Sequence, residues 1–212
     1  MDNPSKLIII GDSAFAQVAY EYFTYDSEYE VVAFAVEREY LKADSMFGLP
    51  VIAFEDIEKL YAPAEHSFFA AMVYTQANKL RTRLYNAAKA KGYRPATYIS
   101  SRAFVWRNAE IGEHSFIFEN NVIQPFVKIG KNVILWSGNH IGHHSTIHDN
   151  CFVSSHVVVS GFVEIGEYCF MGVNSTVANN TTIGNNCLVG AGALILGNVE
   201  DDQKVVGIWK KK

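Results

Sequence analysis

Apolar residues recur along this chain with two different periods. From Ile99 to Ile195, an aliphatic residue or methionine occupies every sixth position without a slip. The residue two places before each of them is small or of medium size, as expected where a second inward side chain crowds a narrow interior. A six-residue period that persists over residues 99–195 predicts a β-solenoid of hexapeptide turns.

The part of the chain before residue 99 instead alternates between strand and helix patterns. The expected strands are residues 6–11, 29–36 and 66–74, and the expected helices are residues 13–23 and 78–92. Ser13 and Asn78 stand where helix N-caps belong, and Gly92 stands at a C′ position. Strand, helix and strand at this spacing predict a small parallel α/β domain of the Rossmann-like type.

Three parts of the chain follow from these periods. We expect an α/β domain over residues 1–98, a β-solenoid over residues 99–198 and a C-terminal tail over residues 199–212. A length of 212 residues with 49% hydrophobic content is sufficient to fill a core in both domains.

The net charge and the lengths of the charged and apolar runs indicate which kinds of partner the protein binds. The net charge of −4, the pI near 6.0 and a single basic run at Lys210–Lys212 give no footprint for nucleic acid or an anionic membrane. The apolar run Leu7–Ile10 is too short for a signal-peptide core or a membrane span. We therefore expect a cytoplasmic protein whose partners are small molecules and other subunits.

The six-residue repeat resembles that of the hexapeptide acyltransferases. The resemblance implies a left-handed parallel β-helix with three six-residue sides in each coil, so residues 18 apart would stack about 4.8 Å apart. Cys151, Cys169 and Cys187 form one such inward column. We interpret them as interior packing rather than as a disulfide or metal site, because cytoplasmic thiols stay reduced and an inward column is closed to ligands.

Five of the seven histidines fall in one stretch, NHIGHHSTIHDNCFVSSH, at residues 139–156. They are His140, His143, His144, His148 and His156. All five avoid the aliphatic positions of the period, so we expect them on outward or turn positions. Three interpretations follow: polar turn residues, metal ligands, or an acid/base device.

The spacing argues against the metal interpretation. Carbonic anhydrases with hexapeptide repeats bind zinc through two histidines a few residues apart and a third about two coils earlier. Two coils before the cluster this chain has Arg107 and Asn108, and His114 is out of register. We therefore expect no metal site.

The acid/base interpretation agrees better with the register. A neutral imidazole can take a proton from an attacking amine or hydroxyl while that group adds to a thioester carbonyl. One coil after His143 stands Gly161, where the missing side chain leaves a backbone N–H open to a thioester oxygen. Asn179 and Gly197 continue this column, so we expect Gly161, Asn179 and Gly197 to line a groove for the pantetheine arm of coenzyme A.

A more specific resemblance rests on residues 139–184, NHIGHHSTIHDNCFVSSHVVVSGFVEIGEYCFMGVNSTVANNTTIG. This segment resembles the family of sialic acid O-acetyltransferases and bacillosamine- or perosamine-type nucleotide-sugar N-acetyltransferases. In that family an Ile-x-His-acid stretch supplies the general base, which the resemblance carries onto His143. It also implies that the first domain holds the nucleotide of an activated sugar, that acetyl-CoA lies between adjacent β-helices of a homotrimer, and that no covalent acyl-enzyme forms.

The residue after the base departs from the family pattern. Relatives commonly have Glu or Asp there to orient the imidazole, and this chain has His144, which cannot be an anionic partner. Asp149, His148 or a residue of another subunit could substitute, or His144 could itself share the role of the base.

The expected nucleotide site departs as well. Relatives carry a glycine-rich loop after the first strand, whereas the segment GDSAFAQ keeps Gly11 and continues with the small residues Ser13 and Ala14, which still allow a phosphate to approach the helix N-terminus. After the second strand the family tends to have Asp-Asp, and this chain has Val36 and Glu37. Glu37 could reach a base or ribose, or be a solvated loop residue.

The sequence thus predicts an acetyl-CoA-dependent sugar N-acetyltransferase. Its acceptor is expected to be an amino group of a nucleotide-linked deoxyamino sugar, its catalytic residues His143, His144 and Gly161, and its attack on the thioester direct. The alternatives are a sugar O-acetyltransferase of the sialic acid type and a non-catalytic trimeric scaffold or binding module.

Overall fold

The protein is described by a computed structural model that covers residues 5–210. The chain forms two compact units. The first comprises the chain up to Thr75 together with Leu80–Tyr98, and the second comprises Gln76–Lys79 and the chain from Ile99 onward. The short segment Gln76–Lys79 therefore groups with the second unit, which the periods in the sequence did not indicate.

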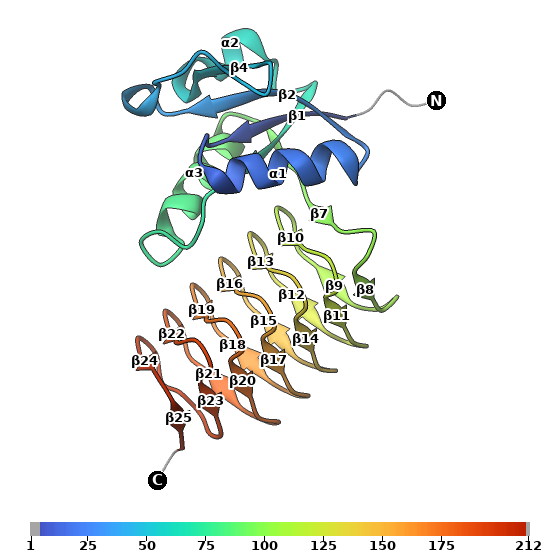
Figure 1. The fold of residues 1–212 in the computed structure, drawn as a ribbon, viewed down its shortest axis with the longest axis vertical. Coiled ribbons are helices and arrows are strands. Elements are labelled where there is room, and N and C mark those ends of the chain that lie inside the picture. Colours follow the sequence, from blue (N-terminus) through green and yellow to red (C-terminus); the bar gives the residue numbers. More distant parts are fainter. Residues whose placement is uncertain (1–4, 211–212) are drawn as a thin grey trace. The chain divides into compact units, whose positions relative to one another are not determined.

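The first unit is an α/β domain, as the sequence predicted. Its strands are β1 (Ser5–Ile10), β2 (Tyr29–Val36), β3 (Ser45–Met46), β4 (Leu49–Ala53), β5 (His66–Ala70) and β6 (Arg94–Pro95), and its helices are α1 (Ala14–Tyr25), α2 (Ile57–Leu60) and α3 (Lys79–Ala90) (Figure 1). Short 3₁₀ turns lie at Arg38–Tyr40 and Phe54–Asp56. The sheet order is β3-β4-β2-β1-β5-β6. Neighbouring strands are parallel except for β3 and β4, which form an antiparallel pair.

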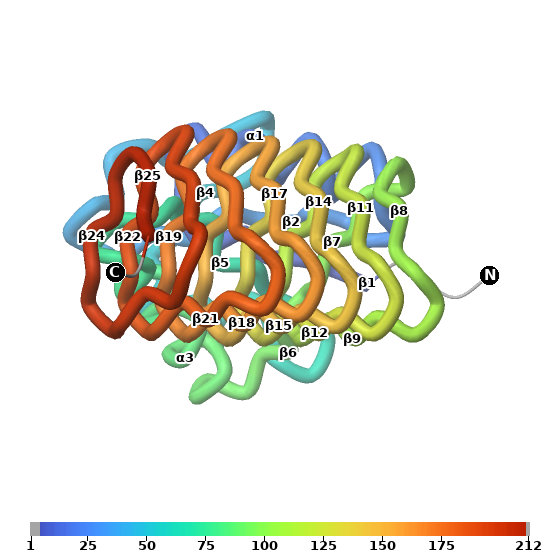
Figure 2. The backbone as a smooth tube through the Cα atoms, turned by 90° about the horizontal axis from the view of Figure 1, so that it is seen from below, coloured from blue at the N-terminus to red at the C-terminus, as the bar shows by residue number. Residues whose placement is uncertain are grey.

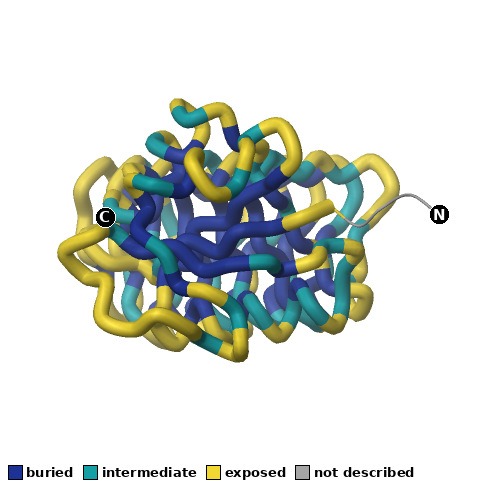
Figure 3. The backbone as a smooth tube through the Cα atoms, turned by 90° about the horizontal axis from the view of Figure 1, so that it is seen from above, coloured by how far each residue is buried: buried dark blue, intermediate teal, exposed yellow. Residues whose placement is uncertain are grey.

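Burial explains why the strand patterns in this domain are continuous rather than alternating. The side chains of β1 change from exposed to buried along the strand, and Leu7–Ile10 are buried in the middle of the sheet (Figure 3). A central parallel strand is covered on both faces and so reads as an uninterrupted apolar run. The third expected strand is shorter than residues 66–74, because β5 ends at Ala70. Strand β4, which contains Pro50, was not predicted.

The second unit is a left-handed parallel β-helix of three sheets, which confirms the predicted fold class. The first sheet contains β7 (Tyr98–Ile99), β10 (Phe116–Ile117), β13 (Ile134–Leu135), β16 (Phe152–Val153), β19 (Phe170–Met171), β22 (Leu188–Val189) and β24 (Lys204–Val205). The second contains β8 (Phe104–Val105), β11 (Val122–Ile123), β14 (His140–Ile141), β17 (Val158–Val159), β20 (Thr176–Val177), β23 (Leu194–Ile195) and β25 (Ile208–Trp209). The third contains β9 (Glu110–Ile111), β12 (Lys128–Ile129), β15 (Thr146–Ile147), β18 (Glu164–Ile165) and β21 (Thr182–Ile183). Figure 2 shows β8, β11, β14 and β17 following one another on successive coils.

Two side chains from each six-residue side point into the β-helix and form its core. The aliphatic positions of the period are buried from Ile117 to Ile195, and the small positions before them are buried as well. The first coil is less protected, since Ile99 is 40% exposed and Val105 and Ile111 are partly buried. The seam of small and aliphatic residues read from the sequence is therefore the core of this domain.

The corners of the β-helix impose a second six-residue rule. A residue with positive φ stands three places before most aliphatic positions, among them Asn132 (φ 56°), His144 (φ 60°) and Phe162 (φ 57°). Asparagine and histidine are enriched in this left-handed conformation, whereas bulky residues such as phenylalanine adopt it less readily. At these corners the backbone sets the direction of each Cα–Cβ bond.

The structure departs from the prediction at the C-terminal end. Residues 199–210 do not form a separate tail, because β24 pairs with β22 and β25 pairs with β23. The partners Leu188 and Lys204 are 16 residues apart, so this coil is shorter than the preceding ones. The six-residue period in the sequence ends at this point, although the pairing of strands between coils continues. Lys211 and Lys212, the rest of the basic run, lie outside the described residues.

Candidate active site on the β-helix

The candidate base stands on the corner between β14 and β15. His143 and His144 are both exposed, and the backbone N–H of His143 donates to Oε1 of Gln124 at 2.9 Å. Gln124 occupies the preceding coil, so this hydrogen bond ties the corner to its neighbour. The side chains of both histidines are thereby presented at an edge of the β-helix that a substrate can reach.

The ring of His143 lies over Gly161, one coil further on, as the register predicted. A methyl group at Gly161 would lie 2.8 Å from Cε1 and 2.9 Å from Nε2 of the imidazole. Within residues 5–210, none of the hydrogen bonds made by His143 involves Nε2. The imidazole of His143 therefore occupies the space that a side chain at position 161 would fill, and its Nε2 remains unbonded there.

The second nitrogen of the ring is engaged by the neighbouring histidine. Nδ1 of His143 lies 3.1 Å from Nδ1 of His144, and the two rings are nearly perpendicular at 87°. His144 is stacked between Phe126, at 4.6 Å and 28°, and Phe162, at 4.8 Å and 16°. Phe126, His144 and Phe162 occupy the same corner on three successive coils, so we call them the corner stack.

The predicted oxyanion donor is not open. The backbone N–H of Gly161 donates to Oδ1 of Asn179 at 2.9 Å, so the structure corrects the expectation of a free amide at this position. The missing side chain at Gly161 does not by itself expose the amide, because the next coil supplies a side-chain acceptor. Asn179 is exposed and its Nδ2 makes no hydrogen bond within the described residues.

The last member of the predicted column is Gly197, where the strict repeat ends. It follows β23 and is partly buried. The next inward residue is Val199, which bridges to Ile183, so the side of the coil is shortened here. Trp209 donates its indole N–H to the carbonyl of Asn198 at 3.0 Å and closes this end of the corner.

The α/β domain brings its predicted residues to the carboxyl ends of β1 and β2. Gly11 has φ of 127°, a backbone conformation that residues with a side chain rarely adopt, so glycine is favoured there. Ser13 is the N-cap residue of α1 but makes no side-chain cap hydrogen bond, and Ala14 is the first helical residue. The N-terminal amides of α1 thus have no side-chain cap from this position.

Glu37 is held by an arginine rather than left free. Arg83 of α3 donates two hydrogen bonds to its carboxylate, at 2.7 and 2.8 Å. These hydrogen bonds lower the pKa of Glu37, against the opposing effect of partial burial. The sequence did not reveal this partner, which is 46 residues away.

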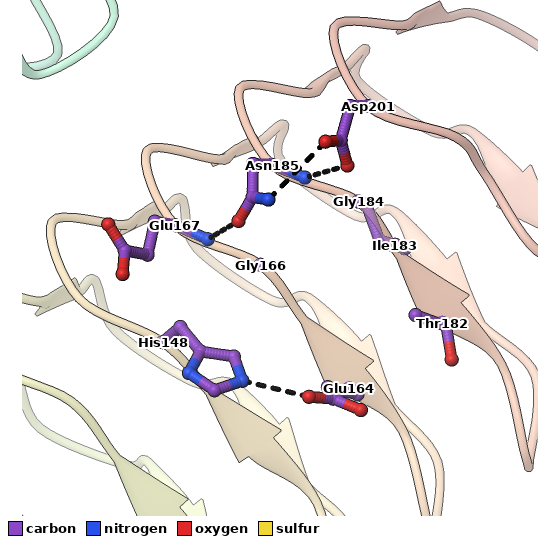
Figure 4. Close-up of a pocket in the computed structure, with 9 residues that line it drawn as sticks. All are labelled: His148, Glu164, Gly166, Glu167, Thr182, Ile183, Gly184, Asn185 and Asp201. Atoms are coloured by element: carbon purple, nitrogen blue, oxygen red, sulfur yellow. Dashed lines mark hydrogen bonds and ion pairs between the residues drawn. The ribbon is translucent and has the colours of Figure 1, made fainter.

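His148 and Asp149, which follow the candidate base in the sequence, are engaged away from His143. Nε2 of His148 lies 2.9 Å from Oε1 of Glu164, and Oδ1 of Asp149 accepts the backbone N–H of Lys131 at 2.8 Å. His148 and Glu164 border a separate recess of about 310 Å³ at the corner that follows the third sheet. Figure 4 shows the His148 ring pointing toward Glu164 there, while Asn185 and Asp201 form a ladder of amide and carboxylate groups.

Whether the protein could bind a metal ion or use a reactive thiol depends on how its histidines, carboxylates and cysteines are placed. Within residues 5–210, no cluster of three or more His, Cys, Asp or Glu side chains could hold a metal ion. Cys151, Cys169 and Cys187 are buried and donate to backbone carbonyls, as an interior column would. The hydrogen bond with Cys151 and burial raise the pKa of Cys169, and burial raises the pKa of Cys187 to about 11. His114, the upstream histidine, is buried and bonded to Asn132.

A β-helix of hexapeptide turns with an imidazole on one corner defines the class of hexapeptide-repeat transferases. Four overlapping matches to the family model "bacterial transferase hexapeptide (six repeats)" cover residues 108–143, 129–161, 144–179 and 162–197. Residues 108–197 thus match the repeat of this family. No curated protein matches the sequence.

Solved structures match the chain over both domains. The acetyltransferase domain of PglB from Neisseria gonorrhoeae is 26% identical, with a TM-score of 0.86 over 96% of this chain and 97% of that one. A variant of perosamine N-acetyltransferase from Caulobacter crescentus, in complex with CoA and GDP-perosamine, is 24% identical, with a TM-score of 0.84 over 95% and 93%. WeeI from Acinetobacter baumannii is 20% identical, with a TM-score of 0.72 over 95% and 96%. The chain is accordingly an enzyme of the acyltransferase class, with the two-domain fold of these proteins.

No helix within residues 5–210 combines the length and the apolarity that a membrane crossing requires.

Proposed function

We propose that this protein transfers an acetyl group from acetyl-CoA to an amino group of a nucleotide-linked deoxyamino sugar. The observation that carries the proposal is the imidazole of His143, which stands over Gly161 with Nε2 open at a corner of the β-helix. The similarity over both domains to a perosamine N-acetyltransferase in complex with CoA and GDP-perosamine supports the amino acceptor and the nucleotide handle, and the similarity to the acetyltransferase domain of PglB supports acetyl transfer.

The chemistry assigned to His143 is that of a general base. The amine nitrogen of the sugar attacks the thioester carbonyl, Nε2 of His143 takes the proton from that nitrogen, and the carbon–sulfur bond breaks. The proton then passes to the departing thiolate, so the products are the amide and free coenzyme A. A positioned base of this kind typically contributes 10²–10⁴-fold in rate.

The oxyanion donor is reassigned to the side chain of Asn179. Its Oδ1 accepts from the amide of Gly161, which leaves the Nδ2 hydrogens directed away from that bond and available to a developing negative charge. Gly161 then orients the donor and provides the space for the base. A variant separates the two assignments: Asn179→Ala frees the Gly161 amide, so activity falls if Asn179 donates and is retained or raised if Gly161 does.

The nucleotide is assigned to the carboxyl ends of β1 and β2 in the α/β domain. The uncapped N-terminus of α1, with Gly11, Ser13 and Ala14, suits a phosphate group, since a helix N-terminus favours anions. Glu37 can still accept a hydroxyl donor from ribose while Arg83 holds its orientation. Gly197 and the shortened coil border the far end of the coenzyme groove in this proposal, and the working form is a homotrimer.

The first test is a coenzyme-release assay with acetyl-CoA and a panel of UDP-, GDP- and dTDP-linked 4-amino sugars. We expect turnover on one acceptor, and its loss in His143→Ala. The matched control is His148→Ala, which removes a nearby corner histidine that pairs with Glu164 instead of contacting Gly161. Turnover on sialic acid but on no amino sugar would replace the acceptor with a hydroxyl group. If neither the wild type nor the two variants bound coenzyme A, the scaffold alternative would be favoured.

A further inference from the structure

The pair formed by His143 and His144 has a chemical requirement that a histidine next to a carboxylate does not have. Two nitrogens 3.1 Å apart form a hydrogen bond only if one carries a proton and the other a lone pair. The bond therefore couples the tautomers of the two rings. With the proton on Nδ1 of His143, its Nε2 has a lone pair and can act as a base. With the proton on Nδ1 of His144, Nε2 of His143 carries a proton and cannot.

We propose that His144 is the positioning residue for the base, acting as a neutral hydrogen-bond acceptor where an acidic residue would otherwise stand. This inference rests on the proposed role of His143. His144 presents the lone pair of Nδ1, His143 donates to it, and Nε2 of His143 is left free over Gly161. The bond persists when the base takes up a proton, because the imidazolium of His143 still donates through Nδ1.

The corner stack supplies the orientation that a neutral acceptor needs. The φ of 60° at His144 sets the direction of its Cα–Cβ bond, and Phe126 and Phe162 cover the two faces of its ring. Phe162 also meets the ring of His143 edge-on at 5.1 Å and 87°. With both faces covered, rotation of the His144 ring out of the hydrogen bond would disturb two stacking contacts.

Other candidates for this role are engaged elsewhere within residues 5–210. Asp149 accepts from the backbone of Lys131, and His148 pairs with Glu164. The groups that pack against the pair are Gln124, Phe126, Gly161 and Phe162, none of which is charged.

A consequence for pH follows from the shared bond. One proton added to Nε2 of His143 occupies the base directly. One proton added to His144 makes its Nδ1 a donor, which forces the inactive tautomer on His143. Either way a single proton on the pair removes the base, so the acid limb of the rate profile should report one proton per pair.

Three substitutions at position 144 test the proposal, and the corner stack itself indicates that the fold tolerates them. Phe162 and Asn180 occupy the same corner on the next two coils with φ of 57°, so phenylalanine and asparagine fit this backbone. His144→Phe preserves stacking and removes the acceptor, whereas His144→Asn supplies an acceptor oxygen. His144→Asp supplies a negative charge, and Asp202 shows aspartate at a corner with φ of 61°.

We expect His144→Phe to lower kcat by about 10²-fold with little change in KM, and His144→Asn to recover most of that loss. His144→Asp should move the acid limb of the kcat/KM profile to higher pH, because an adjacent anion favours the imidazolium. Equal kcat and equal pH profiles for the wild type and His144→Phe would overturn the proposal. So would an Asn variant as impaired as the Phe variant at unchanged melting temperature.

A second readout does not depend on finding the acceptor sugar. ¹⁵N NMR of histidine-labelled protein, at a pH where both rings are neutral, should show His143 protonated at Nδ1 and unprotonated at Nε2. The fixed tautomer should be lost in His144→Phe and kept in His144→Asn. The opposite tautomer in the wild type would refute the positioning role. An inactive protein with the expected tautomer would instead refute the proposed reaction and leave the positioning role of His144 supported.

Discussion

The substitution Gly161→Ala tests whether the empty space at this position serves the candidate base rather than the stability of the fold. The added methyl group would lie 2.8 Å from Cε1, 2.9 Å from Nε2 and 3.3 Å from Nδ1 of His143, with no backbone atom among these nearest neighbours. Carbon atoms in contact prefer about 3.5 Å or more, so the ring must move by roughly 0.7 Å. Gly161 does not have a left-handed φ, so alanine suits its backbone.

The expected result is an active-site defect without a folding defect. A displacement of this scale costs on the order of 10²-fold in rate, or about 2.7 kcal/mol of transition-state stabilisation. The exposed imidazole can move into solvent, so the melting temperature should change by no more than about 2 °C. The assay is coenzyme release under saturating acetyl-CoA, with a melting curve of the same preparation.

Gly172→Ala is the matched control on another corner. A methyl group there would lie 2.5 Å from the backbone nitrogen of Ala191 and 2.6 Å from the carbonyl carbon of Gly190, and neither can move without shifting a coil. We expect it to destabilise the protein by about 1–3 kcal/mol, as overpacking does. The reasoning fails if Gly161→Ala is as destabilised as Gly172→Ala, or if it keeps full kcat while NMR shows the ring of His143 displaced.

The other predictions concern the core, the thiols and the ion pair of the α/β domain. Ile147→Ala should lower the free energy of unfolding of the β-helix by about 2–5 kcal/mol in a urea titration, because Ile147 is fully buried in the column of aliphatic residues. A loss well below this range would contradict that placement. Cys169 should resist maleimide in the native protein and react in urea, because its raised pKa and burial keep it a shielded thiol; rapid native labelling would contradict the interior column. Glu37→Gln should cost less than about 1 kcal/mol at pH 7, since the side chain of Arg83 is 54% exposed. The pKa of Glu37 is lowered in the folded state, so the ion pair contributes to the free energy of unfolding above the unfolded pKa near 4 and stops contributing as the pH falls through the folded pKa. Urea titrations should therefore give the same free energy of unfolding for the variant and the wild type in acid.

The features foreseen from the sequence are those that depend on local repetition. The aliphatic seam from Ile117 to Ile195 and the small positions beside it are buried as the six-residue period required. The stacking of His143 against Gly161 also followed from the spacing, since residues 18 apart lie on neighbouring coils throughout this part of the chain. The prediction was wrong about the end of the repeat, because shortened coils keep the backbone ladder while they change the period.

Side-chain partners within the candidate site were not foreseeable in the same way. The spacing placed Asn179 above Gly161, but it did not indicate that the amide oxygen of Asn179 would take the glycine N–H. The same limit applies to Glu37, whose partner Arg83 lies on a helix 46 residues further along. These pairings depend on rotamers and on which elements lie side by side.

By itself, the sequence determined the architecture, the inward column of cysteines and the corner on which the candidate base stands, because burial and a fixed period are properties of the chain read in order. Only the tertiary structure decided that His143 bonds to His144, that Phe126 and Phe162 cover the second ring, and that His148 turns to Glu164 instead. The physical reason is that a period fixes which residues are neighbours, whereas hydrogen bonds also require a direction. That direction comes from the left-handed corners and from the side chains packed around each ring.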